Sequence, residues 1–170
     1  MQRKQIDTVS SLAFCPIARS LDRVGDQWSM LILRDAFYGM TRFDEFQKSL
    51  GIATNMLTRR LSTLVADGLL ERRQYCEHPP RFEYVLTPPG RDFRPVLLTL
   101  LAWGRTHFSS EGATLQLIDQ TTGAIADPVL VDRHTGKPIG PDHVTVAGPA
   151  ASEGLKRRLA ARPPKPASDA

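Results

Sequence analysis

Apolar residues in the first part of the chain recur with the spacing of α-helices, and this pattern predicts four helices in succession. Pro16 suits the first position of a helix, and Gly25 ends that helix. The second segment is apolar nearly all round, which is typical of the most buried helix. Thr41 is expected to cap the third helix, which Gly51 closes. The predicted helices cover residues 16–24, 28–37, 42–50 and 54–66.

The fourth predicted helix, residues 54–66, is called the recognition helix below because of its outward face. An exposed helix face usually carries Glu and Lys in pairs, but this helix contains no acidic residue. Amide, hydroxyl and guanidinium groups read base edges and phosphates in a DNA major groove. Together with the short turn before it, the segment predicts a helix-turn-helix, and an ordinary solvated helix is the alternative. The inward positions are Leu57, Leu61, Leu64 and Val65, and the outward positions are Asn55, Thr58, Arg59, Ser62 and Thr63.

Two strand-like segments follow, residues 69–75 and 81–86, and they predict a hairpin whose loop is longer than a tight turn. A hairpin directly after a recognition helix is a wing, and a basic wing reaches the neighbouring minor groove or the DNA backbone. Arg72, Arg73 and Arg81 lie on this predicted wing. Arg81 is the preferred minor-groove contact, and a solvated loop arginine is the alternative.

A long helix is predicted over residues 91–108. Its apolar face is wider than a body of three small helices can cover, so we expect a second subunit there. The alternative is burial against the first helix within one chain. The expected interface residues are Phe93, Val96, Leu97, Leu100, Leu101, Trp103 and Gly104.

Residues 115–148 contain two similar segments, each with a strand, an Asp-x-x-Thr-Gly turn and a second strand. Asp at the first position and Gly at the last fit a type I turn. The layout is similar to the paired knuckles of a zinc ribbon, with Asp and Thr where Cys would stand. Because these are poor tetrahedral zinc ligands, we predict a small β unit without a metal. The turns begin at Asp119 and Asp132, and His134 and His143 are expected to be solvated.

Charge and composition indicate where the predicted parts of the chain begin and end. Residues 1–110 hold 15 Lys and Arg against 11 Asp and Glu, so the whole net charge of +4 belongs to them. No apolar run approaches the roughly 18 residues of a membrane span, no secretory signal is recognisable, and two cysteines are too few for a disulfide framework. We therefore expect a cytoplasmic protein without a membrane partner. The expected parts are an N-terminal arm (1–12), a winged helix-turn-helix domain (13–110), the β unit (111–149) and a basic, disordered tail (150–170).

Several short runs, all in one order, resemble the HxlR family of winged-helix transcriptional regulators, which are relatives of MarR. They are Gly25-Asp-Gln-Trp, Gly39-Met-Thr-Arg-Phe-Asp-Glu-Phe, Leu57-Thr-Arg-Arg-Leu and Asp67-Gly-Leu-Leu-Glu-Arg, and the resemblance covers residues 13–109. It implies a homodimer that binds a near-palindromic operator in double-stranded DNA, and we expect a repressor. Two features depart from the family: Ala53 replaces a common Ser, leaving Thr54 as an alternative cap, and some 60 residues follow the long helix.

Some members of the HxlR family sense electrophiles or oxidants through a cysteine at the position of Cys15. The start of a helix stabilises a thiolate and lowers the pKa of the thiol, and Arg19 one turn later would add to this effect. The alternative is a buried, inert thiol. Cys76 is expected to be exposed on the wing loop without a role. A small-molecule effector is also compatible with the resemblance.

No nucleophile with a base, Gly-rich phosphate loop or carboxylate cluster is recognisable, so we predict neither catalysis nor a cofactor. The fold is expected to be α+β and mainly α, with a winged helix-turn-helix, a long dimerisation helix and a small β-hairpin unit. A non-catalytic protein-interaction module on the same scaffold is the alternative function. The predicted DNA contacts are Thr41, Arg42, Thr54, Asn55, Thr58, Arg59, Arg60, Ser62, Arg72, Arg73 and Arg81.

Overall fold

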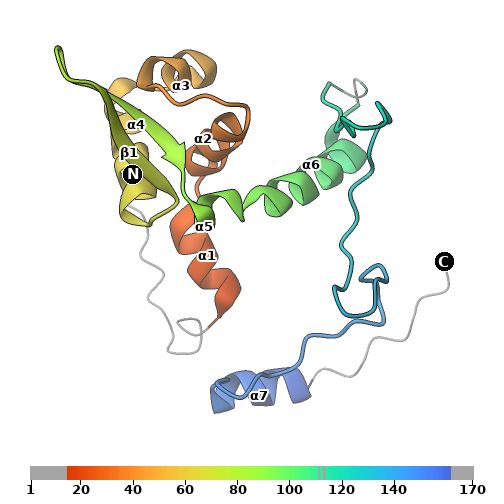
Figure 1. Ribbon diagram of the computed structural model, residues 1–170. Coiled ribbons are helices and arrows are strands. Elements are labelled where there is room, and N and C mark those ends of the chain that lie inside the picture. The colour runs from red at the N-terminus through yellow and green to blue at the C-terminus, as the bar shows by residue number, and fades with distance from the viewer. Residues whose placement is uncertain (1–14, 111, 113, 162–170) are drawn as a thin grey trace. The chain divides into compact units, whose positions relative to one another are not determined.

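The computed structural model describes residues 15–110, 112 and 114–161 (Figure 1). The predicted arm, residues 1–12, therefore lies outside the described residues. Contacts divide the described chain into two units, residues 23–128 and, separately, residues 15–22 with 129–161. The elements are α1 (Pro16–Val24), α2 (Gln27–Phe37), α3 (Phe43–Leu50), α4 (Thr54–Ala66), β1 (Leu70–Cys76), β2 (Arg81–Leu86), α5 (Pro88–Arg91), α6 (Arg94–Phe108) and α7 (Glu153–Ala160).

The core of the 23–128 unit lies between α2, α3, α4 and the first residue of β1. The predicted inward residues of the recognition helix α4 at positions 57, 61 and 64 are fully buried. Burial of each such leucine contributes about 1.5–3 kcal/mol, so the core holds α4 along one stripe. The buried apolar residues are Val24, Ile32, Leu33, Phe46, Ile52, Leu57, Leu61, Leu64 and Leu70.

The start of α3 differs from the prediction, because Arg42 and not Thr41 is its N-cap residue. The Glu45 carboxylate accepts hydrogen bonds from the backbone N–H groups of Thr41 and Arg42, both at 2.9 Å. These bonds satisfy the free donors at the start of the helix in place of a threonine hydroxyl. Two backbone N–H groups that donate to one carboxylate also lower the pKa of Glu45.

The start of α4 is capped at Ala53, and no side chain makes a capping hydrogen bond there. Thr54 is the first helical residue, so the alternative in which Thr54 is the cap is wrong. Its hydroxyl oxygen instead accepts a hydrogen bond from Gln47 Nε2 at 2.9 Å. This contact joins α3 to α4 across the turn of the helix-turn-helix.

The wing is the antiparallel hairpin β1–β2, in which Leu70 pairs with Leu86 and Arg73 pairs with Glu83. An irregularity follows Gln74, where the chain shifts register. The base of the wing is tied to the helices, because the backbone N–H of Tyr84 donates to the Thr41 carbonyl at 2.7 Å. An isolated bridge between Arg42 and Glu83 extends this pairing.

The predicted long helix over 91–108 is broken in the structure. The short helix α5 ends at Arg91, and α6 begins at Arg94 with Pro95 in its first turn. Proline has no backbone N–H and suits the first turn of a helix rather than its interior, so a continuous helix through this point is disfavoured. From this break α6 extends away from the helices α2–α4 (Figure 1).

A close backbone contact at Gly90 holds α5 against the wing. A Cβ atom at this position would collide with the carbonyl oxygen of Leu69 and would lie 3.2 Å from Leu86. We expect Gly90→Ala to lower the free energy of unfolding by about 1–3 kcal/mol, as overpacking of a filled site usually does. Urea unfolding measures the change. Gly154→Ala, where a Cβ meets open space, is the control and should leave the unfolding midpoint unchanged; equal midpoints for the two variants would contradict the tight contact.

The two Asp-x-x-Thr-Gly segments form the predicted turns, but each closes one residue wider than a type I turn. The N–H of Gly123 donates to the Asp119 carbonyl, and the N–H of Gly136 donates to the Asp132 carbonyl, both at 2.8 Å. The aspartate side chains accept bonds from within their own turns, which lowers the pKa of both carboxyls. Among the described residues, no three His, Cys, Asp or Glu side chains form a group that could hold a metal ion.

The C-terminal segment also contains a helix where the sequence indicated disorder. Ser152 caps α7, and its hydroxyl oxygen accepts a hydrogen bond from the N–H of Leu155 at 3.3 Å. An ion pair between Lys156 and Glu153 at 2.8 Å adds to this short helix. The rest of the predicted tail, residues 162–170, lies outside the described residues.

Candidate nucleic-acid interface

The outward face of α4 offers several side chains that are free to bind. Asn55, Thr58, Arg59 and Ser62 are all exposed. The Thr58 hydroxyl donates to the Thr54 carbonyl at 2.8 Å, so only its oxygen lone pairs remain available outward. Within the described part of the chain, the side chains of Asn55, Arg59 and Ser62 make no hydrogen bond or ion pair. An unpaired amide and guanidinium on one helix face can form bidentate contacts to adenine and guanine.

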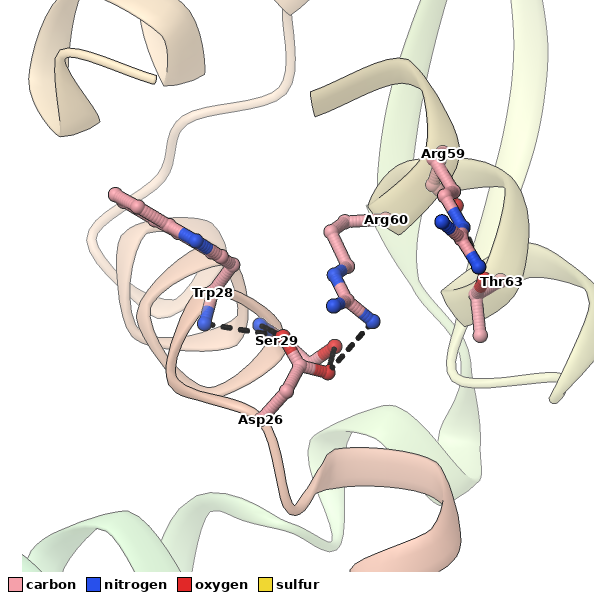
Figure 2. A network of polar contacts seen from close by, with 6 residues as sticks. All are labelled: Asp26, Trp28, Ser29, Arg59, Arg60 and Thr63. Carbon is pink, nitrogen blue, oxygen red and sulfur yellow. Dashed lines mark hydrogen bonds and ion pairs between the residues drawn. The ribbon is translucent and has the colours of Figure 1, made fainter. Parts of the chain in front are cut away.

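Arg60 lies in different surroundings from its neighbour Arg59 (Figure 2). Its guanidinium Nη1 is 3.1 Å from Asp26 Oδ2, and the two side chains are only 17% and 19% exposed. The Nε atom of Arg60 is buried without a hydrogen-bond partner. The structure therefore places this predicted phosphate contact in an internal ion pair.

Asp26 was not among the predicted site residues. Its Oδ1 atom accepts hydrogen bonds from the backbone N–H groups of Trp28 and Ser29, each at 3.1 Å, and so caps α2. Its Oδ2 atom accepts a hydrogen bond from the Ser29 hydroxyl at 2.6 Å and also forms the ion pair with Arg60. An aspartate directly before an apolar helix is the sequence signal for such a cap, but nothing local indicates the arginine.

Arg72 on the wing and Arg42 at the start of α3 each lie against an aromatic ring. The Arg72 guanidinium lies over the Phe82 ring, 3.5 Å from its centroid, and Arg42 lies 5.1 Å from the centroid of Tyr75. Such cation–π contacts orient a guanidinium without neutralising its charge. The aromatic partners Phe82 and Tyr75 were missed, although Phe82 is a diagonal neighbour of Arg72 across the hairpin.

Arg73 and Arg81 complete the basic wing. Arg73 pairs with Glu71 at 3.0 Å, and this exposed pair raises the pKa of the arginine and lowers that of the glutamate. Arg81 is exposed at the start of β2, opposite Cys76. Among the described residues, Arg81 has no ion-pair partner. The outer end of the wing thus presents the Arg81 guanidinium without an ion pair, and Glu77 lies in the adjoining loop.

The apolar face of α6 is only partly covered within one chain. Phe93 and Leu97, which were expected at the subunit interface, pack against the core of their own chain. Farther along, Val96, Leu100 and Trp103 are 49%, 45% and 53% exposed, and no residue of α6 is buried. A helix of fifteen residues that exposes this much apolar surface is typical of an interface.

A cavity of about 590 Å³ opens between α2, α6 and the segment after α6. Apolar side chains form most of its wall, with the cations of Arg34 and Arg94 and the Tyr38 side chain among them. Its size fits a small organic molecule. The sequence pattern gave no sign of which residues line it.

The two cysteines occupy different positions, and Cys76 alone departs from expectation. Cys15 directly precedes α1, where its carbonyl accepts the N–H of Arg19 at 3.0 Å, and its thiol is half-buried and free. Cys76 ends β1 instead of lying in the loop, and it is half-buried rather than exposed. Its thiol donates to the His78 carbonyl at 3.7 Å.

Comparison with known proteins gives a consistent result. A family model described as HxlR-like helix-turn-helix matches residues 23–112, more than half of the chain. The HTH-type transcriptional regulator Rv3095 of Mycobacterium tuberculosis is 39% identical over 145 residues, which are 85% of this chain and 90% of the relative. That alignment extends past the winged helix into the C-terminal segment. In the described ranges, no helix combines the length and hydropathy needed to cross a membrane.

Two solved structures extend the comparison. PA1374 of Pseudomonas aeruginosa, described as a candidate transcription factor, has a TM-score of 0.60 and 49% identity, covering 85% of this chain and 100% of that one. The redox regulator HypR in its oxidised form has a TM-score of 0.51 and 36% identity, covering 55% of this chain and 97% of that one. The predicted α+β winged-helix fold is thereby confirmed, as is the prediction of a regulator rather than an enzyme.

Proposed function

Because the chain belongs to the HxlR-like helix-turn-helix family of transcriptional regulators, we propose that it binds a near-palindromic operator as a homodimer. The observation that carries this proposal is the outward face of α4, which has no carboxylate and exposes Asn55 and Arg59 without internal partners. In the major groove, Arg59 contacts guanine and Asn55 contacts adenine. Thr54, Thr58 and Ser62 lie on the same outward side and bind phosphates or base edges.

The wing contributes contacts beside the major groove. Arg42 and Arg72, which are oriented by aromatic rings, bind phosphates, and Arg73 joins them if its pair with Glu71 opens. Arg81, at the outer end of the hairpin, enters the adjacent minor groove or contacts its backbone. Thr41, whose side chain is part-exposed at the start of α3, completes this set with a backbone contact.

The dimer forms through α6. Support comes from the exposed residues Val96, Leu100 and Trp103, which continue the stripe that Phe93 and Leu97 begin against the core. We expect the two recognition helices of this dimer to lie about 34 Å apart, the length of one turn of DNA. Leu101 and Gly104 belong to the same face, and glycine allows close approach of the second helix.

A binding assay tests this function. Duplex DNA from the region upstream of the protein's own gene is titrated with protein at several salt concentrations, beside an unrelated duplex of equal length. We expect the upstream duplex to bind at least 10³-fold more tightly at physiological salt, the lower end for specific binding. Equal affinity for both duplexes at every salt concentration would contradict a sequence-specific regulator. Lower expression of a reporter behind the bound duplex identifies repression, and higher expression identifies activation.

The regulator responds to an oxidant or electrophile through Cys15. This proposal is supported by the position of the half-buried free thiol just before α1 and by the likeness to the redox regulator HypR. Treatment with diamide and glutathione, which joins Cys15 to glutathione in a mixed disulfide while diamide is reduced to the hydrazine, is expected to weaken operator binding at least tenfold, and Cys15→Ser is expected to abolish the response. Cys76→Ser is the matched control and retains the response. Loss of the response in Cys76→Ser alone would assign it to the other thiol.

The cavity between α2 and α6 is a second route of control, by a small apolar molecule with an anionic group near Arg94, because Arg34 is already paired with Asp35 at 2.7 Å. A ligand there contacts both the core helix α2 and the dimer helix α6. Native mass spectrometry of the purified protein tests for such a molecule. A bound mass that persists when Leu101 is replaced by Trp would contradict binding in this cavity.

A further inference from the structure

Two consecutive arginines of the recognition helix have opposite surroundings. Arg59 is exposed on the outward face, whereas Arg60 reaches from α4 toward Asp26 at the start of α2 (Figure 2). At 3.6 residues per turn, neighbouring side chains of a helix diverge by about 100°. In the sequence the two arginines are equivalent cations. In the structure Arg60 lies inside the fold and Arg59 lies on its surface.

Asp26 is a well-defined anchor for this arginine. Its carboxylate already accepts two backbone N–H groups and the Ser29 hydroxyl, so the orientation of both oxygens is fixed before Arg60 is considered. Ser29 is itself fully buried on α2. The guanidinium of Arg60 therefore lies against a carboxylate that is fixed at the start of α2, beside the buried Ser29.

We propose that Arg60 is a positioning residue, which sets the rotation of α4 through Asp26 so that Arg59 and Asn55 face DNA, and that Arg60 itself does not contact DNA. This inference rests on the proposed function, because it assumes that the outward face of α4 reads an operator. It replaces the phosphate contact expected for Arg60 from the sequence.

The packing of α4 explains why such a residue is needed. Leu57, Leu61 and Leu64 hold the helix along one stripe, and a single apolar stripe resists separation better than it resists rotation about the helix axis. Arg60 lies three positions after Leu57, about 60° from that stripe. The ion pair with Asp26 lies away from the stripe, so it opposes a rotation of α4 that would move the Arg59 guanidinium away from its base.

The unpaired Nε atom of Arg60 supports a role in position rather than in stability. A buried donor without a partner is unfavourable, and a buried ion pair by itself is weak evidence of stabilisation. The pair also uses only one guanidinium nitrogen, Nη1. Because Asp26 already pairs with the positive charge of Arg60, this side chain can bind a phosphate only if the ion pair breaks.

The test compares Arg60→Met and Asp26→Asn with Arg105→Met. Asparagine is as good an N-cap as aspartate, so Asp26→Asn removes the charge and keeps the start of α2. Arg105 is also paired with a carboxylate, that of Asp127 at 2.9 Å, and its replacement controls for the loss of one paired arginine. The probes are a duplex that the wild-type protein selects from a random library and an unrelated duplex of equal length.

We expect Arg60→Met and Asp26→Asn each to weaken binding to the selected duplex about tenfold, while binding to the unrelated duplex stays unchanged. The slope of log affinity against log salt also stays at the wild-type value, because no phosphate contact is lost. The double variant binds no more weakly than either single variant, since both changes break one contact. Arg105→Met behaves as wild type.

Loss of about one unit of salt slope, with equal loss on both duplexes, would overturn the proposal and make Arg60 a phosphate contact. Unchanged discrimination in both variants would overturn it as well. Arg60→Lys, which retains a donor for Asp26, is expected to regain most of the discrimination, and it keeps the test decisive if Arg60→Met does not fold. If the wild-type protein selects no sequence, the proposed function fails first, which is distinct from failure of the positioning role.

Discussion

Replacement of Arg59 by alanine is expected to lower the affinity for the operator by about 1–3 kcal/mol, roughly 5- to 150-fold, while binding to unrelated DNA changes little. The reason is the geometry of α4. Arg59 is exposed on a face without carboxylates and has no ion pair among the described residues, so its whole guanidinium is available to a guanine edge. A bidentate contact of this kind discriminates between base pairs, whereas a phosphate contact does not.

Fluorescence anisotropy with the operator and an unrelated duplex measures both affinities for Arg59→Ala. A panel of operators with single substitutions adds a sharper readout, because the variant should lose its preference at one base pair in each half-site. Arg105→Ala, which removes a paired arginine on α6, is the control for the change in net charge. Parallel loss on the operator and on unrelated DNA would show that Arg59 binds a phosphate instead.

Replacement of Leu100 by glutamate is expected to raise the dissociation constant of the dimer by about 10⁴-fold or more. Leu100 is 45% exposed within one chain and lies on the face of α6 that we propose to meet the second copy. An unpaired charge in a buried interface costs about 3–5 kcal/mol, and twofold symmetry places two such charges in one dimer. Sedimentation velocity over a range of protein concentrations measures the dissociation constant directly.

Thr106→Glu is the matched control for this experiment. Thr106 is exposed on the same helix, six positions later and therefore about 120° around the axis from Leu100. Its hydroxyl donates to the Ala102 carbonyl at 3.0 Å and makes no other hydrogen bond in the described structure. Equal weakening of the dimer by both variants would place the interface elsewhere on α6.

The helices of the winged-helix body were predictable because their ends carry local signals. Pro16, Gly25 and Gly51 mark boundaries that need no knowledge of the remainder of the fold, and the buried stripe of α4 follows from the helical period alone. The break before α6 was missed because the apolar repeat continues across it. The start of α6 is set by Pro95 and not by the apolar repeat.

The sequence predicted which face of α4 carries the candidate site, but it did not predict which contacts the side chains of α4 make. Helical spacing placed Asn55, Arg59 and Ser62 together, and all three are exposed. Arg60 stands between the inward and outward faces, so spacing is compatible with either side. Its surroundings are decided by Asp26, which is 34 positions earlier and reaches it only when α2 and α4 pack together.

The hydrogen bond between Tyr84 and the Thr41 carbonyl has a consequence for how related regulators can diverge. It fixes the base of the hairpin to the helices, so insertions or deletions in the loop at residues 77–80 need not displace α4. Over evolutionary time the outer hairpin can therefore change length and charge while α4 keeps the position that we propose for reading bases. Related regulators can in this way change the wing residues that we propose to contact DNA beside the operator, while α4 still recognises the same half-site.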